Sequence, residues 1–245
     1  MNYLLTIESQ KLINKNIISF ERAQKKLKSN YKKWEEDSLI IKTDNENFNR
    51  IINRSLLDLK LLQTDLGEGF IPIAGIPWFA VPFGRDSIIT SLQTLVMNPK
   101  IARGTLRTLT RFQGKEVNED REEEPGKIMH GIRSGELAHF NLIPHTPYYG
   151  TIDATLLFLV LAVEYFNWTG DLGFIKKILP HLCAALRWID KYGDIDQDGY
   201  VEYYPKNKRW IINQRWKDSK DSSMHQDGSL AVPPIALVEV QGYVY

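Results

Sequence analysis

The sequence has 245 residues, 43% of them hydrophobic, and a formal net charge of +1 at pH 7. This length can bury one full core with at most an appended piece. The near-neutral charge argues against nucleic acid as a partner, because it provides no broad basic field. The single cysteine, Cys183, cannot form an internal disulfide, and the apolar run 154–163 is too short to cross a bilayer. We therefore expect a soluble, cytoplasmic protein with no membrane partner.

The first 42 residues are expected to form a unit of their own. Residues 1–17 are short mixed segments that could be the last strand of a preceding domain. Residues 18–37 form a charged segment with one stripe of apolar residues at helical spacing, which predicts a helix lying across another domain. We interpret 1–42 as the end of an N-terminal domain and a linker helix, and 43–245 as a second domain.

Longer, more apolar helices are expected from residue 44 onward, and the spacing of their connections is informative. Asp44 is a suitable N-cap for the first, and Pro99 and Pro180 are each suited to the first turn of a helix. The expected helices are 45–62, 87–97, 99–112, 152–168, 180–192 and 232–245. Long connections at 64–86, 113–150 and 193–231 alternate with short ones, so antiparallel helix pairs would gather the long loops at one rim. This pattern predicts an all-α fold, a layered α/α toroid or solenoid.

The first long connection contains Trp78, Arg85 and Asp86 at the entry to a helix. Asp86 can be read as a helix cap. It can also be read with Arg85 as a sugar clamp, in which the arginine donates to hydroxyl groups, the aspartate accepts from them, and Trp78 or Phe79 forms an aromatic wall of the site.

The second connection is rich in polar groups, and loops of this length are often functional. His130, His139 and His145 share no helix face and have no cysteine nearby, so we expect no metal site there. Asp153 can cap the following helix or, with Tyr148 and Tyr149, form a polar and aromatic rim.

The third connection places Asp218 between Trp216 and the lysines Lys217 and Lys220. A general acid must keep its proton near neutral pH, so its charged form must be disfavoured by burial or by a second carboxylate. Trp216 could supply apolar cover, whereas the lysines favour the charged form. The alternative is an exposed loop with a salt-bridged aspartate.

An acidic loop precedes this segment. Asp194, Asp196, Asp198 and Gly199 match the first half of an EF-hand, but its twelfth position is Pro205, where a bidentate glutamate is needed. Glu202 could supply one ligand. A calcium site and a simple Asp/Gly turn therefore both remain open.

Five segments together resemble the amylo-α-1,6-glucosidase (glycogen-debranching) family, which is related to mannosylglycerate-hydrolase-like and glucoamylase-like glycosidases. They are Trp78 with 84–87, 125–130, 149–155, 216–219 and 239–243, in the family's order. The resemblance covers residues 40–245 and implies an (α/α)6 toroid of twelve helices, of which this chain supplies about six. The first 40 residues would then be the end of a β-rich N-terminal domain and its linker helix.

The resemblance also assigns roles. Asp218 matches the family's general acid, and Arg85 and Asp86 match binders of the glucosyl unit at the cleavage point. The remaining substrate-binding candidates are Trp78, His130, Tyr149, Asp153 and Trp216. Similar proteins often have His-Glu where this chain has His130-Gly131, so the polar side chain of that glutamate has no counterpart here. The family's general base, a glutamate in the second half of the toroid, would lie beyond Tyr245, so that half is expected downstream.

The implied reaction is inverting hydrolysis of an α-glucosidic bond, with the α-1,6 branch linkage of a glycogen-like glucan as the expected substrate. The chain alone would then turn over little, and no cofactor is expected. Two alternatives remain open: a hydrolase of a small α-glucoside or α-mannoside such as a glycosylglycerate, and a non-catalytic carbohydrate-binding protein.

Overall fold

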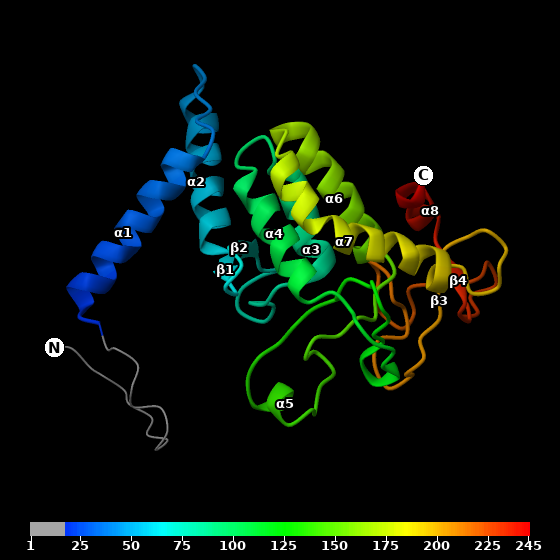
Figure 1. Cartoon of the computed structure of the whole chain (residues 1–245). Coiled ribbons are helices and arrows are strands. Elements are labelled where there is room, and N and C mark those ends of the chain that lie inside the picture. The colour runs from blue at the N-terminus through cyan, green and yellow to red at the C-terminus, as the bar shows by residue number, and fades with distance from the viewer. Residues whose placement is uncertain (1–17) are drawn as a thin grey trace. The chain divides into compact units, whose positions relative to one another are not determined.

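A computed structural model describes residues 18–245, and these residues are mostly helical (Figure 1). Helices account for 47% and strands for 8%. Within the described range there are eight α-helices and two sheets of two strands each. The predicted helical class is therefore confirmed, whereas the strand considered within residues 1–17 falls outside the described range.

The chain divides into two units between Ile40 and Ile41. The described part of the first unit contains α1 (Phe20–Asp37), which matches the helix predicted for 18–37. Ser19 caps it, since its hydroxyl oxygen accepts a hydrogen bond from the backbone N–H of Arg22 at 3.3 Å.

The second unit begins with α2 (Glu46–Leu61). Its N-cap is Asn45, whose side-chain oxygen accepts from the N–H of Phe48 at 3.0 Å, so the cap predicted at Asp44 is wrong by one residue. The following connection contains a short antiparallel pair, β1 (Gln63–Asp65) and β2 (Phe70–Pro72).

Four helices form the main core of this unit. They are α3 (Gly84–Gln93), α4 (Lys100–Arg111), α6 (Ala154–Thr169) and α7 (Leu172–Trp188). Each buries apolar side chains, among them Ile88, Leu106, Phe158 and Ile178. Helix α6 has an almost entirely apolar sequence. It packs against α3, α4 and α7, and these three helices cover much of its surface (Figure 1). Within residues 18–245, no helix has both the length and the apolar character needed to cross a bilayer.

Helix α7 is continuous through Pro180, so the prediction that a helix begins at this proline is wrong. The helix begins eight residues earlier, at Leu172, and the carboxylate of its N-cap, Asp171, accepts from the N–H of Phe174 at 3.0 Å. Proline removes one backbone hydrogen bond from a helix interior. Burial of Phe174, Ile178 and Ala185 on the same helix outweighs that loss.

The long connections contain short elements that the periodicity did not indicate. A 3₁₀ turn, Glu119–Arg121, and helix α5 (Glu136–His139) lie in the second connection. A π-helical turn, Ile189–Gly193, continues α7. Strand β3 (Glu202–Tyr203) pairs with β4 (Ile235–Ala236), and the last helix is α8 (Val238–Val244), which begins later than predicted because β4 precedes it.

Candidate functional site

Arg85 is positioned by a backbone contact at the start of α3. The N–H of Gly84 donates to the carbonyl of His130 at 2.9 Å, and Phe83 forms a β-bridge with Gly131. A Cβ atom at position 84 would lie 2.1 Å from the carbonyl oxygen of Met129, so only glycine allows this approach. The first turn of α3 is thus held against the second long connection.

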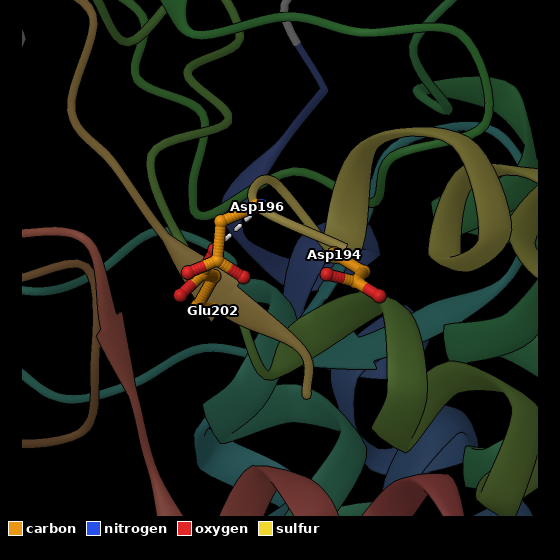
Figure 2. A group of neighbouring side chains, drawn as sticks. All are labelled: Asp194, Asp196 and Glu202. Atoms are coloured by element: carbon orange, nitrogen blue, oxygen red, sulfur yellow. Dashed lines mark hydrogen bonds between the residues drawn. The ribbon is translucent and has the colours of Figure 1, made fainter. Parts of the chain in front are cut away.

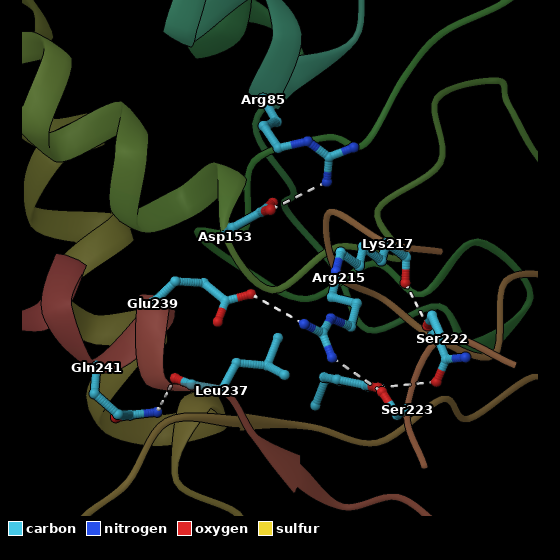
Figure 3. A network of polar contacts seen from close by, with 11 residues as sticks. Arg85, Asp153, Arg215, Lys217, Ser222, Ser223, Leu237, Glu239 and Gln241 are labelled. Atoms are coloured by element: carbon cyan, nitrogen blue, oxygen red, sulfur yellow. Dashed lines mark hydrogen bonds and ion pairs between the residues drawn. The ribbon is translucent and has the colours of Figure 1, made fainter. Parts of the chain in front are cut away.

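Arg85 forms a buried ion pair with Asp153 (Figure 3). Their Nη1 and Oδ2 atoms are 3.1 Å apart, and the side chains are only 12% and 5% exposed. The hydroxyl of Thr151 donates to the other carboxylate oxygen at 2.6 Å. Asp153 occupies the N-cap position of α6, but its side chain makes no capping hydrogen bond. Its carboxylate instead forms the ion pair with Arg85.

The third connection meets this ion pair. The N–H of Ile152 donates to the carbonyl of Gln214 at 2.9 Å, which attaches the connection beside Asp153. Two residues further on, the Trp216 ring centroid lies 5.2 Å from the guanidinium carbon of Arg85. This is cation–π distance, and the indole remains 56% exposed. Three sequence-predicted residues, Arg85, Asp153 and Trp216, therefore come together from three separate segments.

A second ion pair, not singled out from the sequence, lies in the same network. Nη2 of Arg215 is 3.5 Å from Oε1 of Glu239 on α8, and Nη1 donates to the hydroxyl of Ser223 at 3.0 Å (Figure 3). Tyr243 follows Glu239 by one helical turn. Burial raises the pKa of Tyr243, and the nearby carboxylates of Asp153 and Glu239 raise it further. The spacing of Glu239 and Tyr243 by four residues was the available signal, since it puts both on one helix face.

His130 lies beside this network as a neutral ring. It is 8% exposed, and its ring meets Phe83 and Tyr148 edge-on at centroid distances of 5.4 and 5.8 Å. Burial lowers the pKa of His130 to about 3, with a further contribution from the positive charge of Arg85. In the described part of the chain, no three histidines converge as metal ligands.

Four other candidate residues are placed differently. Trp78 is 78% exposed, whereas Tyr149 belongs to the main core and its hydroxyl donates to the carbonyl of Phe112 at 2.8 Å. Asp86 is exposed in the first turn of α3, and since the N-cap is Phe83, the cap interpretation of Asp86 is wrong. The fourth residue is Asp218.

Asp218 lies on an exposed turn at the edge of the network. The side chain of Asn213 donates to the carbonyl of Ser219 at 2.6 Å, and the hydroxyl of Ser222 donates to that of Lys217 at the same distance. These bonds close the turn two residues after Trp216. Asp218 itself is exposed, so Trp216 does not bury it.

The acidic loop after α7 brings three carboxylates together (Figure 2). Oxygen atoms of Asp194, Asp196 and Glu202 lie within 4.8 Å of one another, a donor set suited to a hard divalent cation. The carboxylates also hold the loop's own backbone: Asp194 accepts from the N–H groups of Asp198 and Gly199, and Glu202 accepts from that of Asp196. Burial and the charge of Asp196 raise the pKa of Glu202. These are the contacts of an Asp/Gly turn, which the sequence offered as the simpler interpretation.

In comparisons with known proteins, no family model and no curated protein matches this chain. The feature of the chain that bears most directly on its function is the meeting of Arg85, Asp153 and Trp216.

Proposed function

We propose that this chain is the first half of an (α/α)6 glycoside hydrolase domain related to the amylo-α-1,6-glucosidases, and that Arg85, Asp153 and Trp216 hold a glucosyl unit. The observation that carries the proposal is the buried Arg85–Asp153 pair beside an exposed indole. The resemblance of five ordered segments to that family supports it independently.

The charges of the network favour a neutral, hydroxyl-rich ligand. Arg85 and Arg215 are each paired with a carboxylate, so the two ion pairs carry no surplus charge for an ionic ligand. Guanidinium groups supply several N–H donors and carboxylates supply several acceptor sites. Sugar hydroxyls use both, and the apolar face of a pyranose can stack on an exposed indole such as that of Trp216.

Asp218 is the proposed proton donor for the departing glycosidic oxygen, because it matches the family's general acid. Since Asp218 is exposed here, the cover or second carboxylate that keeps it protonated would have to come from the bound substrate or from the second half of the toroid. Asp218 lies on the same turn as Trp216, which would place it next to a bound sugar. Inversion also needs a second carboxylate, about 6.5–9.5 Å away, to activate a water on the opposite ring face. The resemblance assigns that base to the second half of the toroid. General-acid assistance contributes on the order of 10²–10⁴ in rate.

Binding of a branched dextrin, measured by calorimetry, tests the sugar site. We expect Trp216→Ala to weaken binding at least about tenfold, since stacking and the arginine contact are both lost. Trp168→Ala is the matched control, because Trp168 is 55% exposed and Trp216 is 56% exposed. Equal effects of the two substitutions would show that the dextrin has no preference for the Arg85 network.

Hydrolysis tests the assignment of Asp218 separately. Any release of glucose from the dextrin by the purified chain should fall in Asp218→Asn while binding is retained. A rate that Asp218→Asn leaves unchanged would reject Asp218 as the acid. Assaying a glucosylglycerate and a mannosylglycerate alongside the dextrin distinguishes the sibling activity on small substrates.

A non-catalytic carbohydrate-binding role is the second candidate, and the exposure of Asp218 favours it. In that case dextrin binding still depends on Trp216, and no glucose is released even when a carboxylate-bearing second half is supplied.

A further inference from the structure

We propose that a cationic groove over α4 and α7 binds an oligophosphate, meaning a small molecule with two or three linked phosphate groups. The groove is a cavity of about 570 Å³ that shares no lining residue with the Arg85 network. Its charged lining consists of Arg103, Arg107, Arg111, Lys115, Lys177 and Glu68.

Three of these cations form a row along α4. Arg103, Arg107 and Arg111 are spaced four residues apart, so they lie on one face of the helix. Each step of four residues rises about 6 Å, and the row therefore extends over about 12 Å. Helix α7 lies next to α4 and contributes Lys177, while Lys115 follows the end of α4 (Figure 1).

Positive charge in the groove is far from balanced by the protein. Of the six charged lining residues, five are cations and one is a carboxylate, in a chain whose formal net charge is +1. Arg107 pairs with Glu68 at 2.9 Å, and Arg103 is 4.0 Å from Asp171, which is not part of the lining. Within residues 18–245, neither Lys115 nor Lys177 has a carboxylate within ion-pair distance, although the charge of Lys177 contributes to lowering the pKa of Asp171.

The arginines keep donors for a ligand. Arg111 uses one N–H on the carbonyl of Leu66, at 2.6 Å, and Arg107 uses one on Glu68. A guanidinium carries five N–H donors, so each retains several. His181 also lines the groove, and burial together with the charge of Lys115 lowers its pKa. Cations are therefore crowded here with little protein charge to neutralise them, as expected of a surface that receives an anion.

Length and charge identify the class of ligand. A single phosphate would engage only part of a row that extends over about 12 Å, whereas linked phosphates can contact successive arginines. The arginine fork matches phosphate oxygens in bidentate geometry. The cavity has the size of a small-molecule site. A nucleic acid would require a broad basic surface, and the near-neutral chain does not supply one.

Calorimetric titration of the whole chain with inorganic triphosphate, at low ionic strength, tests the proposal. The decisive pair of variants is Lys177→Glu and Lys176→Glu, which make the same charge change at adjacent exposed positions of α7, only one of which lines the groove. We expect Lys177→Glu to weaken triphosphate binding at least about tenfold, and Lys176→Glu to change it by less than about threefold. Circular dichroism checks that both variants are folded.

Two further titrations complete the test. Orthophosphate should bind at least about tenfold more weakly than triphosphate, because it spans fewer arginines. Equal weakening by Lys177→Glu and Lys176→Glu, or no triphosphate binding by the unmodified chain, would overturn the proposal. So would a single-stranded oligonucleotide that binds more tightly than triphosphate and loses its affinity in Lys177→Glu, since the ligand class would then be wrong.

Discussion

The buried imidazole of His130 should make the fold sensitive to mild acid. An ordinary histidine has a pKa near 6.5, whereas burial and the charge of Arg85 lower that of His130 to about 3. Because the folded-state pKa is depressed, the neutral ring supports folding fully above the unfolded pKa. That support is lost as the pH falls below about 6.5 toward the folded value. At pH 5 this histidine is protonated in the unfolded chain but not in the folded chain. The free energy of unfolding is therefore lower by about 2 kcal/mol at pH 5 than at pH 7.

Urea unfolding at pH 7 and pH 5 measures this loss. Other groups titrate over the same interval, including His145, whose pKa is lowered to about 4. The comparison is therefore made between the unmodified chain and His130→Phe, which keeps an aromatic ring between Phe83 and Tyr148. We expect the unmodified chain to lose about 2 kcal/mol more than His130→Phe between the two pH values. His225→Gln, at an exposed position, is the control and should behave as the unmodified chain. Identical losses in all three proteins would refute the reasoning.

Three further substitutions test contacts of the fold. Arg85→Met leaves Asp153 buried without its partner and should lower the free energy of unfolding in urea by about 3–5 kcal/mol. Adding Asp153→Asn in a double variant should restore part of this loss, whereas strictly additive losses would argue against the ion pair. Gly84→Ala should destabilise by more than about 2 kcal/mol, because its Cβ would lie 2.1 Å from a backbone oxygen, whereas Gly75→Ala, with nothing within 4 Å, should not. Pro180→Ala should raise stability by up to about 3 kcal/mol in thermal unfolding, since alanine restores a helical hydrogen bond. A lower melting temperature would mean that the helix accommodates the proline without cost.

The positions of the helices were largely predictable, and the exceptions have physical reasons. Apolar periodicity indicated α2, α4 and α6 to within one or two residues at their ends. It failed at Pro180, because local backbone preference was overridden by the packing of a whole helix. It also missed β1 and β2, whose three-residue strands are too short to show alternation.

The candidate site was predictable only in part. Arg85, Asp153 and Trp216 could be predicted as site residues because each lies in a polar and aromatic segment within or next to a long connection. Their mutual contacts could not be predicted, since they join residues far apart in the sequence. The pairing of Arg215 with Glu239 depends on where α8 docks, which no local pattern specifies. The exposure of Asp218 could not be predicted from its flanking residues either. Trp216 suggested a buried carboxylate, whereas the neighbouring lysines suggested a solvent-exposed one.

The backbone junction at Gly84 has a consequence for how the protein can vary. The hydrogen bond from the N–H of Gly84 to the carbonyl of His130 joins two backbone segments. The position of the Arg85 Cα atom is therefore fixed by backbone contacts and not by neighbouring side chains. Core residues beneath α3 can therefore be exchanged for others of similar volume without shifting the arginine, provided the glycine stays. Substitutions intended to raise stability can therefore be made among the core residues beneath α3, but not at Gly84.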